Sequence, residues 1–479
     1  MLPKFTLLKK LWGTNGSLLL LLSASTIMVF AMLTSNELWT MESRWAAVTM
    51  QMLLRHDYLH PMLYTAPYYD KPLLSYWLIL GFAKLLGHLD EWALRLPSAL
   101  AAITTVYCTY RIGTILYNRS TGLTAGWLLI TLFFFDFWGR TSSADMLNVA
   151  GIALAVFWYL KRKPYPNFLS YAVFFTIIAL TCLCKGLTGA LPLLLILPDL
   201  LMNQEWKKLG NLSLLCAALL GLGIYLLPFF LSAYSANQTL QNTGLIEVFR
   251  ENLQRFFAPF DHAEPFYIYL IYLPIYLLPW TIFFIPAIGH NLWHWRQLNF
   301  NQRWLNIIIF ILLLVFSLSG SKRGYYILPA LPFAVLLTAD WLNRYLFTLN
   351  NWAARIQNVT WIIYVLLFAW FAIIQPWQNP HNAGIWAFAV KVQQQATLKK
   401  PWDQWEITAL PSAHDSSAIF YLQPKHEITP VNAAAVDRHK IIIATAKDLA
   451  QTKPILNNYH LIMENETSLN ASMALIPRN

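Results

Sequence analysis

The sequence has 479 residues, of which 57% are hydrophobic and only 12% are charged, and its mean hydropathy is +0.45. Soluble domains carry about 25% charged residues, so this composition excludes an ordinary soluble protein and indicates a polytopic membrane protein. The formal net charge of +11 does not require a nucleic-acid partner, because basic residues accumulate in the cytoplasmic loops of membrane proteins.

The first apolar run extends from about Ser17 to Leu33 and follows three lysines. A cleaved signal peptide is one interpretation of this run. No small-residue cleavage site follows it and many further apolar runs do, so we predict an uncleaved first helix. Ten later apolar runs bring the prediction to about eleven spans; they fall near 93–113, 120–137, 146–160, 168–183, 187–201, 211–232, 266–288, 304–319, 326–340 and 357–375.

The orientation of the spans follows from the lysines and arginines. With a cytoplasmic N-terminus, nearly every basic short loop, such as Lys161-Arg162-Lys163, falls on the cytoplasmic side, as the positive-inside rule requires. This parity holds only if the apolar stretch 73–87, which is short for a span, is a surface or re-entrant helix. Other charged residues then gather on the external face and predict an external active site: Glu42, Arg44, Asp70, Lys71, Asp145, Lys185, Arg255 and Lys322.

Residues 41–54 have apolar side chains at helical spacing and predict an amphipathic helix on the external surface. A plain interfacial anchor is the simpler interpretation of this helix. However, Arg44 is followed after a short loop by Tyr68-Tyr69-Asp70-Lys71-Pro72, and neighbouring charges at a membrane are costly without a charged ligand or partner. Because Arg and Lys bind phosphates and Tyr donates hydrogen bonds, the pattern predicts a site for a lipid-linked phosphate.

Several later turns carry further candidate residues on the same face. Asp145 begins a span, where it could act simply as a helix cap. Lys185, Arg255 and Lys322, the last of which precedes Tyr326, lie in or near external turns, where each could be a basic residue that faces the headgroups. Several such residues on one face favour an anionic ligand.

The composition shifts after residue 377 to that of a small soluble domain. Residues 440–444 and 459–463 predict short buried strands, and residues 416–422 and 446–451 predict helices. We therefore expect an all-α polytopic membrane domain at 1–377, with external amphipathic helices at about 41–87 and about eleven or more spans. A small soluble external α/β domain follows at 378–479.

Short segments spread over residues 37–335 carry a resemblance to a known family. They include Glu42-Ser43-Arg44-Trp45-Ala46, residues 68–78, Arg95-Leu96-Pro97-Ser98-Ala99, Ala144-Asp145-Met146, Lys185-Gly186, Arg255-Phe256, Pro279-Trp280 and residues 317–332. In these segments the chain resembles the GT-C superfamily of polyprenyl-phosphate-sugar glycosyltransferases. It is most similar to bacterial aminoarabinose transferases that modify lipid A and is more distantly similar to protein O-mannosyltransferases.

The resemblance implies a transferase that moves a sugar from a polyprenyl-phosphate donor to an external lipid or glycan acceptor, such as lipid A, with inversion. It also implies a bacterial inner-membrane location with the active site facing the periplasm, and no nucleic-acid partner. We expect the donor phosphate to be held by basic and tyrosine residues: Arg44, Tyr68, Lys71, Arg255, Lys322 and Tyr326. Asp145 matches the family's catalytic carboxylate, Glu42 and Asp70 are the other carboxylate candidates, and Lys185 is a further site candidate.

The sequence departs from the family at two places. Met41 stands where the family typically has an Asp, which leaves Glu42 alone in that motif. The Glu-His that often precedes the later Arg-Phe is absent from residues 250–256, so we name no metal ligand, although a divalent metal stays open as a cofactor. The alternative function is a non-catalytic protein that binds or moves polyprenyl lipids, with Met41 marking a degenerate site.

Overall fold

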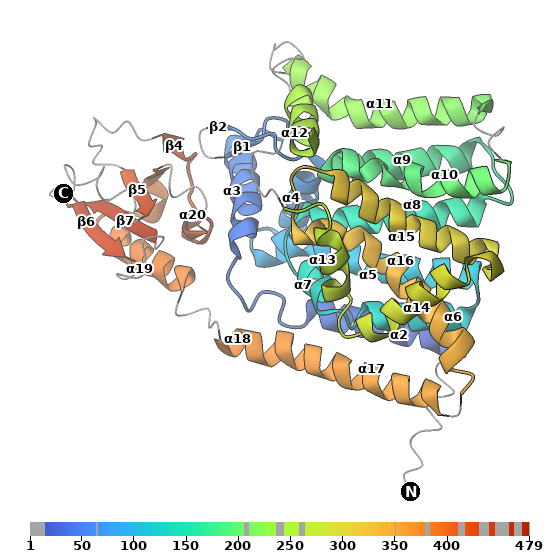
Figure 1. The fold of residues 1–479 in the computed structure, drawn as a ribbon. Helices are drawn as coiled ribbons and strands as arrows, with labels where there is room; N and C mark the ends of the chain where they lie inside the picture. The colour runs from blue at the N-terminus through green and yellow to red at the C-terminus, as the bar shows by residue number, and fades with distance from the viewer. Residues whose placement is uncertain are drawn as a thin grey trace, which may run out of the picture.

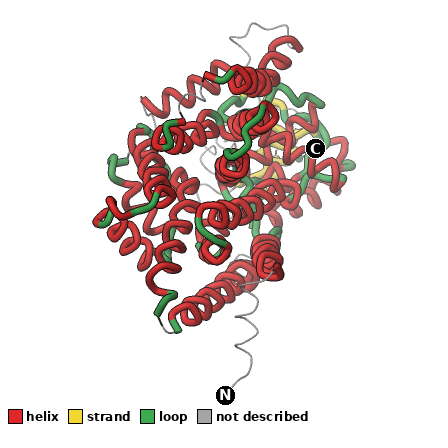
Figure 2. The backbone as a smooth tube through the Cα atoms, turned by 90° about the vertical axis from the view of Figure 1, so that its right-hand side faces the viewer, coloured by secondary structure: helices red, strands yellow, loops and turns green. Residues whose placement is uncertain are grey.

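The computed structural model describes residues 15–63, 66–205, 210–235, 244–257, 264–349, 351–378, 384–410, 417–430, 440–445, 459–463 and 472–478. Figure 1 shows a large bundle of helices joined to a small sheet at one end of the bundle. Figure 2 views the molecule from the end opposite the sheet, so that many helices are seen nearly end-on and the strands lie behind them. The predicted fold class, an all-α membrane protein with a small C-terminal α/β part, is confirmed.

Seven helical segments among the described residues are long and apolar enough to cross a membrane. They are α5 (Glu91–Leu116), α8 (Ala144–Arg162), α9 (Phe168–Lys185), α11 (Leu212–Ser235), α15 (Phe300–Leu318), the segment Gly324–Leu346 that contains α16 (Leu331–Trp341), and the segment Trp352–Gln378 that contains α17 (Trp352–Ala369) and α18 (Gln375–Gln378). Shorter apolar helices accompany them, including α2 (Asn15–Phe30) and α10 (Leu191–Met202).

The predicted count of about eleven spans is not reproduced, because several apolar runs are broken. The run at 120–137 forms α6 (Arg119–Leu129) and α7 (Phe133–Gly139), which meet at 74°. The run at 266–288 forms α13 (Ile268–Tyr276) and α14 (Thr281–Trp293), and Pro279 lies in the break between them. Hydropathy measures the length of an apolar run but does not show where the backbone turns within it.

Two helices that precede α5 differ from the spans. Figure 1 shows α3 (Thr40–Arg55) running across the direction of the long helices at one end of the bundle. The hairpin of β1 (Met62–Leu63) and β2 (Ala66–Pro67) leads to α4 (Leu74–Leu86), which has 13 residues and is too short for an ordinary span. Gly87 ends α4 with φ +82°, a left-handed conformation that favours glycine.

Glycine allows close packing between two of the helices. A Cβ added to Gly122 on α6 would lie 2.3 Å from the carbonyl oxygen of Tyr110 on α5, and one added to Gly113 would lie 2.7 Å from the Cα of Gly122. Small residues let the backbones of membrane helices approach in this way, and the packing replaces the hydrophobic effect that is missing within lipid. The α5–α6 pair therefore depends on these two glycines.

The C-terminal region forms a five-stranded sheet in the order β4-β3-β5-β7-β6. Its elements are α19 (Ile385–Thr397), β3 (Glu406–Ala409), α20 (Ala418–Leu422), β4 (Thr429–Pro430), β5 (Lys440–Thr445), β6 (Tyr459–Met463) and β7 (Ser472–Pro477). β5 pairs in parallel with β3 and antiparallel with β7. The strands predicted at 440–444 and 459–463 are thus present, but β6 lies at the edge of the sheet and only its Tyr459 is buried, contrary to the expected buried strand. The helix predicted at 416–422 is α20. The helix predicted at 446–451 lies outside the described residues.

The C-terminal region packs against α3. The backbone N–H of Leu38 donates a buried hydrogen bond of 2.9 Å to the hydroxyl of Tyr421, and the N–H of Trp386 donates to Glu37 Oε1 at 2.9 Å. Apolar residues of α3, α4, α19, α20 and the sheet form one continuous buried cluster. One side of α3 therefore faces the sheet region, and its remaining surface is available to form a wall of the site described below.

Candidate functional site

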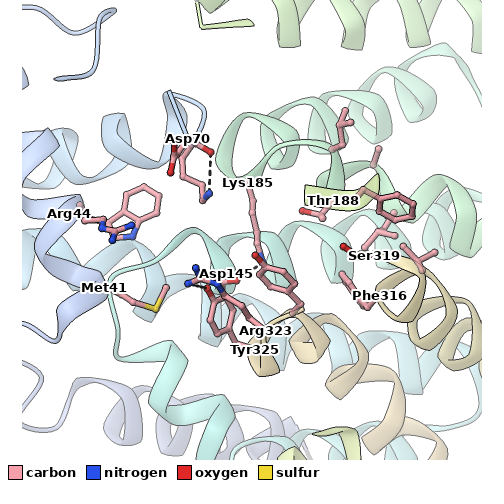
Figure 3. Close-up of a pocket in the computed structure, with 18 of the residues that line it drawn as sticks. Met41, Arg44, Asp70, Asp145, Lys185, Thr188, Phe316, Ser319, Arg323 and Tyr325 are labelled. Atoms are coloured by element: carbon pink, nitrogen blue, oxygen red, sulfur yellow. Dashed lines mark hydrogen bonds and ion pairs between the residues drawn. The ribbon is translucent and has the colours of Figure 1, made fainter. Parts of the chain in front are cut away.

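A cavity of about 830 Å³ lies where α3, the segment that leads into α4, the start of α8 and the end of α9 meet. Figure 3 shows its polar side chains pointing into this common space. The polar lining consists of Arg44, Tyr68, Asp70, Lys71, Tyr76, Asp145, Lys185, Thr188, Ser319, Arg323, Tyr325 and Tyr326. Apolar side chains, including Met41, Leu191, Leu194 and Phe316, complete the walls. Residues far apart in the sequence thus form one amphipathic chamber.

Asp145 and Lys185 form an ion pair at the centre of the cavity. Asp145 lies in the first turn of α8, where the Ser143 side chain caps the helix by accepting a hydrogen bond of 3.2 Å from the Asp145 N–H. Lys185 is the last residue of α9, and its Nζ donates to Asp145 Oδ1. The Lys185 ammonium also lies 5.0 Å from the ring centre of Tyr326. The side chains of Asp145 and Lys185 are only 8% and 10% exposed, so little water screens the pair.

A second polar group comes from α3 and the segment before α4. The hydroxyl of Tyr68 interacts with the side chains of both Arg44 and Asp70. Burial, supported by the negative charge of Asp70 and opposed by the positive charge of Arg44, raises the pKa of Tyr68 to about 12. Tyr68 therefore keeps its proton near neutral pH and can donate a hydrogen bond to an anion. Lys71 Nζ donates to the backbone oxygen of Asp70 at 3.1 Å, which holds the ammonium at the cavity wall.

Glu42 lies outside the cavity, although the sequence pointed to it as a catalytic candidate. Its carboxylate is 2% exposed and accepts from Arg95 Nε at 2.9 Å and Arg95 Nη2 at 2.8 Å. It also accepts from the backbone N–H groups of Ser142 at 2.7 Å and Trp39 at 3.0 Å. Four donors around one buried carboxylate leave little capacity to bind a substrate. Glu42 instead connects the start of α3 to α5 and to the loop before Asp145.

Two other candidates are absent from the described lining of the cavity, Lys322 because it is placed elsewhere and Arg255 because its side chain is not described. Lys322 is buried and does not line the cavity, whereas its neighbour Arg323 does and donates from Nη1 to the hydroxyl of Tyr325 at 3.0 Å. Arg255 belongs to α12 (Leu245–Phe257), but its side chain lies outside the described part of the structure. The neighbouring Phe256 lines the cavity. The structure thus brings together seven of the ten predicted site residues: Arg44, Tyr68, Asp70, Lys71, Asp145, Lys185 and Tyr326.

Sequence reasoning did not list several polar contributors to the cavity, among them Arg323, Tyr325 and Thr188. Arg323 and Tyr325 lie in the same short segment as Lys322 and Tyr326, so the segment itself was the available signal. Its residue pattern could not show which of two adjacent basic side chains faces inward. Thr188 lies in a 3₁₀ turn (Leu187–Ala190) after Lys185 and has no charge to single it out.

A metal site among the described residues would need several His, Cys, Asp or Glu side chains close together. Within the described ranges, no group of three or more His, Cys, Asp or Glu side chains is close enough to hold an ion. The two carboxylates that line the cavity, Asp70 and Asp145, are accompanied by the four cations Arg44, Lys71, Lys185 and Arg323. This excess of positive charge suits an anionic ligand.

The fold and the sequence define a class of membrane protein. The family model of dolichyl-phosphate-mannose-protein mannosyltransferases matches residues 70–231. The fold matches the crystal structure of ArnT from Cupriavidus metallidurans bound to undecaprenyl phosphate, with a TM-score of 0.75, 16% identity and coverage of 97% of this chain and 98% of that chain. The chain is therefore a multi-pass membrane protein with the same fold as this ArnT structure, and the predicted resemblance is confirmed.

Curated proteins of similar sequence have more specific names than the family model. An undecaprenyl phosphate-alpha-4-amino-4-deoxy-L-arabinose arabinosyl transferase of Pectobacterium atrosepticum is 27% identical, over 70% of this chain and 63% of the relative. A transferase of the same name from Pseudomonas fluorescens is 25% identical, over 70% of this chain and 59% of the relative. The chain thus spans less than two thirds of the length of these relatives.

Proposed function

We propose that this chain is a membrane glycosyltransferase that moves a sugar from a polyprenyl-phosphate donor to an external lipid or glycan acceptor such as lipid A, with inversion. One observation carries the proposal: among the described residues, a single cavity is lined by four cations and two carboxylates together with apolar helix surfaces. A polyprenyl-phosphate sugar has a charged diester between an isoprenoid chain and a polar sugar, so its parts match those of the cavity. The names of the curated relatives support the same donor class.

The charges suggest how the reaction is promoted. The acceptor oxygen attacks the anomeric carbon, and the bond from that carbon to the phosphate oxygen breaks. The polyprenyl phosphate that leaves gains negative charge as the bond breaks. Lys71 and Arg44, with hydrogen bonds from Tyr68 and Tyr326, would stabilise that charge more strongly in the transition state than in the bound donor. On the family resemblance, Arg255 is proposed as a further contact to the phosphate.

Asp145 is the carboxylate best placed to act on the acceptor. It lies inside the cavity, whereas Glu42 does not, and Lys185 holds it in a fixed position. For a hydroxyl acceptor, Asp145 would accept the proton that the attacking oxygen loses. An ionised phosphate acceptor has no such proton to lose, so Asp145 and Lys185 would then orient it. Met41, which lines the cavity in place of an Asp, is easier to accommodate in the second case.

Transfer by the purified protein is the direct test. The protein should release polyprenyl phosphate from a polyprenyl-phosphate sugar and label an acceptor lipid, and a lipid A preparation is the first acceptor to try. The alternative, a non-catalytic binder with a degenerate site at Met41, predicts donor binding without turnover. Glycolipid profiles of cells with and without the protein would then identify the transferred sugar and the acceptor.

Lys71→Ala should weaken donor binding by about 1.5–3 kcal/mol, because hydrogen bonds to charged groups contribute on that scale. Binding of a fluorescent or radiolabelled polyprenyl-phosphate sugar measures the change. Lys84→Ala is the matched control, since Lys84 is an exposed lysine on α4 that does not line the cavity. Equal donor affinity in the Lys71→Ala, Lys84→Ala and parental proteins would remove Lys71 from the phosphate site.

The proposed external location of the cavity is tested with topology reporters. Asp145 and Lys163 lie at opposite ends of α8, so a reporter after Lys163 should report the cytoplasm. A reporter at the C-terminus should report the periplasm, on the side of the cavity. If both reporters are active in the same compartment, either α4 crosses the membrane or a later span is assigned to the wrong side.

A further inference from the structure

A second cavity, of about 210 Å³, extends from Leu193, which also lines the site cavity, toward the opposite end of the spans. It is bounded by the ends of α8, α9, α10 and α11 and includes Arg162 and Lys163 in its lining. Arg162 is 17 residues beyond Asp145 on α8, which corresponds to about 26 Å along the helix. This separation places the second cavity near the other surface of the membrane, and the proposed transfer reaction leaves it without a role.

The interior of this cavity is apolar and partly open to the hydrocarbon. Phe174, Phe175 and Ile196 line it, together with Leu193 and Leu197 of α10. Leu193 and Leu197 are 40% and 38% exposed. The cavity is therefore open on this side to whatever surrounds the helix bundle. An apolar cavity has no groups to hold water and favours hydrocarbon. Its natural content is therefore an acyl chain.

Polar residues surround the opening of the cavity, and one of them, Lys163, forms an ion pair. Lys163 Nζ donates hydrogen bonds to both carboxylate oxygens of the buried Asp199, at 2.8 and 2.7 Å. We therefore do not count this lysine among the groups that could bind a ligand. Lys161 and Arg162 are exposed and lie 5.6 and 4.9 Å from the ring of Trp158. Glu205 also lines the rim. The described lining thus presents one exposed cation, Arg162, and one acid, Glu205, outside the Lys163–Asp199 pair, and Lys161 lies beside this lining against Trp158.

We propose that the second cavity binds an anionic glycerophospholipid from the leaflet at that end of the bundle. One acyl chain occupies the apolar interior, and the phosphate lies against Arg162 at the rim, with Lys161 as a second cation beside Trp158. Basic pockets between membrane helices bind anionic headgroups, and the ring of Trp158 is suited to the interface between lipid and water. The proposal does not depend on the transfer reaction, because this lipid is neither donor nor acceptor.

Native mass spectrometry of the whole chain in detergent tests the proposal. It measures the binding of phosphatidylglycerol, with phosphatidylcholine as the comparison lipid. Arg162→Gln should weaken phosphatidylglycerol binding about fivefold, the effect of one cation near an anionic headgroup. Leu197→Trp should fill the interior and remove the tightly bound lipid. The matched controls are Arg296→Gln, an exposed arginine outside both cavities, and Leu201→Trp, an exposed leucine of α10 outside both linings. Neither control should change lipid binding.

Affinity for the polyprenyl-phosphate donor should be the same in Arg162→Gln, Leu197→Trp and the parental protein. Three results would overturn the proposal. The first is phosphatidylglycerol binding no tighter than phosphatidylcholine, and the second is unchanged lipid binding in Leu197→Trp. The third is a loss of donor affinity in Leu197→Trp, which would assign the cavity to the distal part of the donor's isoprenoid chain instead.

Discussion

Asp145→Asn should slow sugar transfer by about a hundredfold or more, because a positioned carboxylate commonly contributes that much as a general base. The substitution keeps the shape of the side chain at the start of α8 but removes its negative charge. Donor affinity should change little, since the phosphate contacts lie mainly on α3 and the segment before α4. Single-turnover transfer with a radiolabelled donor measures the rate, and equilibrium binding measures the donor affinity separately.

The Asp145–Lys185 ion pair makes a stability control necessary. Removing one partner of a buried pair costs about 3–5 kcal/mol, so Asp145→Asn should also lower the melting temperature. The double variant Asp145→Asn with Lys185→Gln removes both charges and should recover most of this stability without recovering activity. A stable single variant that transfers sugar at the parental rate would refute the assignment of Asp145 and would favour an acceptor that arrives already ionised.

Glu42→Gln should destabilise the protein by about 3–5 kcal/mol, because it leaves the buried guanidinium of Arg95 without its carboxylate. The two side chains are 2% and 5% exposed, so water cannot replace the lost partner. Glutamine keeps one acceptor oxygen, so its NH2 group would face two of the four donors: either Arg95 Nε and the Ser142 N–H, or Arg95 Nη2 and the Trp39 N–H. Thermal unfolding in detergent, monitored with the lipid and detergent concentrations held constant, measures the change.

Glu247→Gln provides the matched control for this prediction. Glu247 pairs with Arg250 at 3.0 Å on the surface of α12, where both side chains are largely exposed. Its loss should change stability by less than about 0.5 kcal/mol. A Glu42→Gln protein with parental stability and no transfer activity would contradict the structural role and return Glu42 to the list of catalytic groups.

Several expectations from the sequence hold because they depend on local properties. Apolar runs are recognisable from composition, so the membrane class was predictable. Short, mostly apolar runs marked the strands predicted at 440–444 and 459–463 before their partners were known. The number of spans was less predictable, because a break such as that between α6 and α7 occurs inside a continuous apolar run.

The sequence by itself determined which residue types are available at the site, since the charges that the positive-inside rule does not explain were visible without a structure. Only the tertiary structure decided which of them face the cavity. Glu42 and Asp145 are both acids at the start of a helix. Glu42 binds Arg95, which is 53 residues away in the sequence, outside the cavity. Asp145 binds Lys185, and both of these residues line the cavity. Such pairings depend on how distant helices pack. Local pattern cannot encode that packing, and so it could not separate a structural carboxylate from one that lines the cavity.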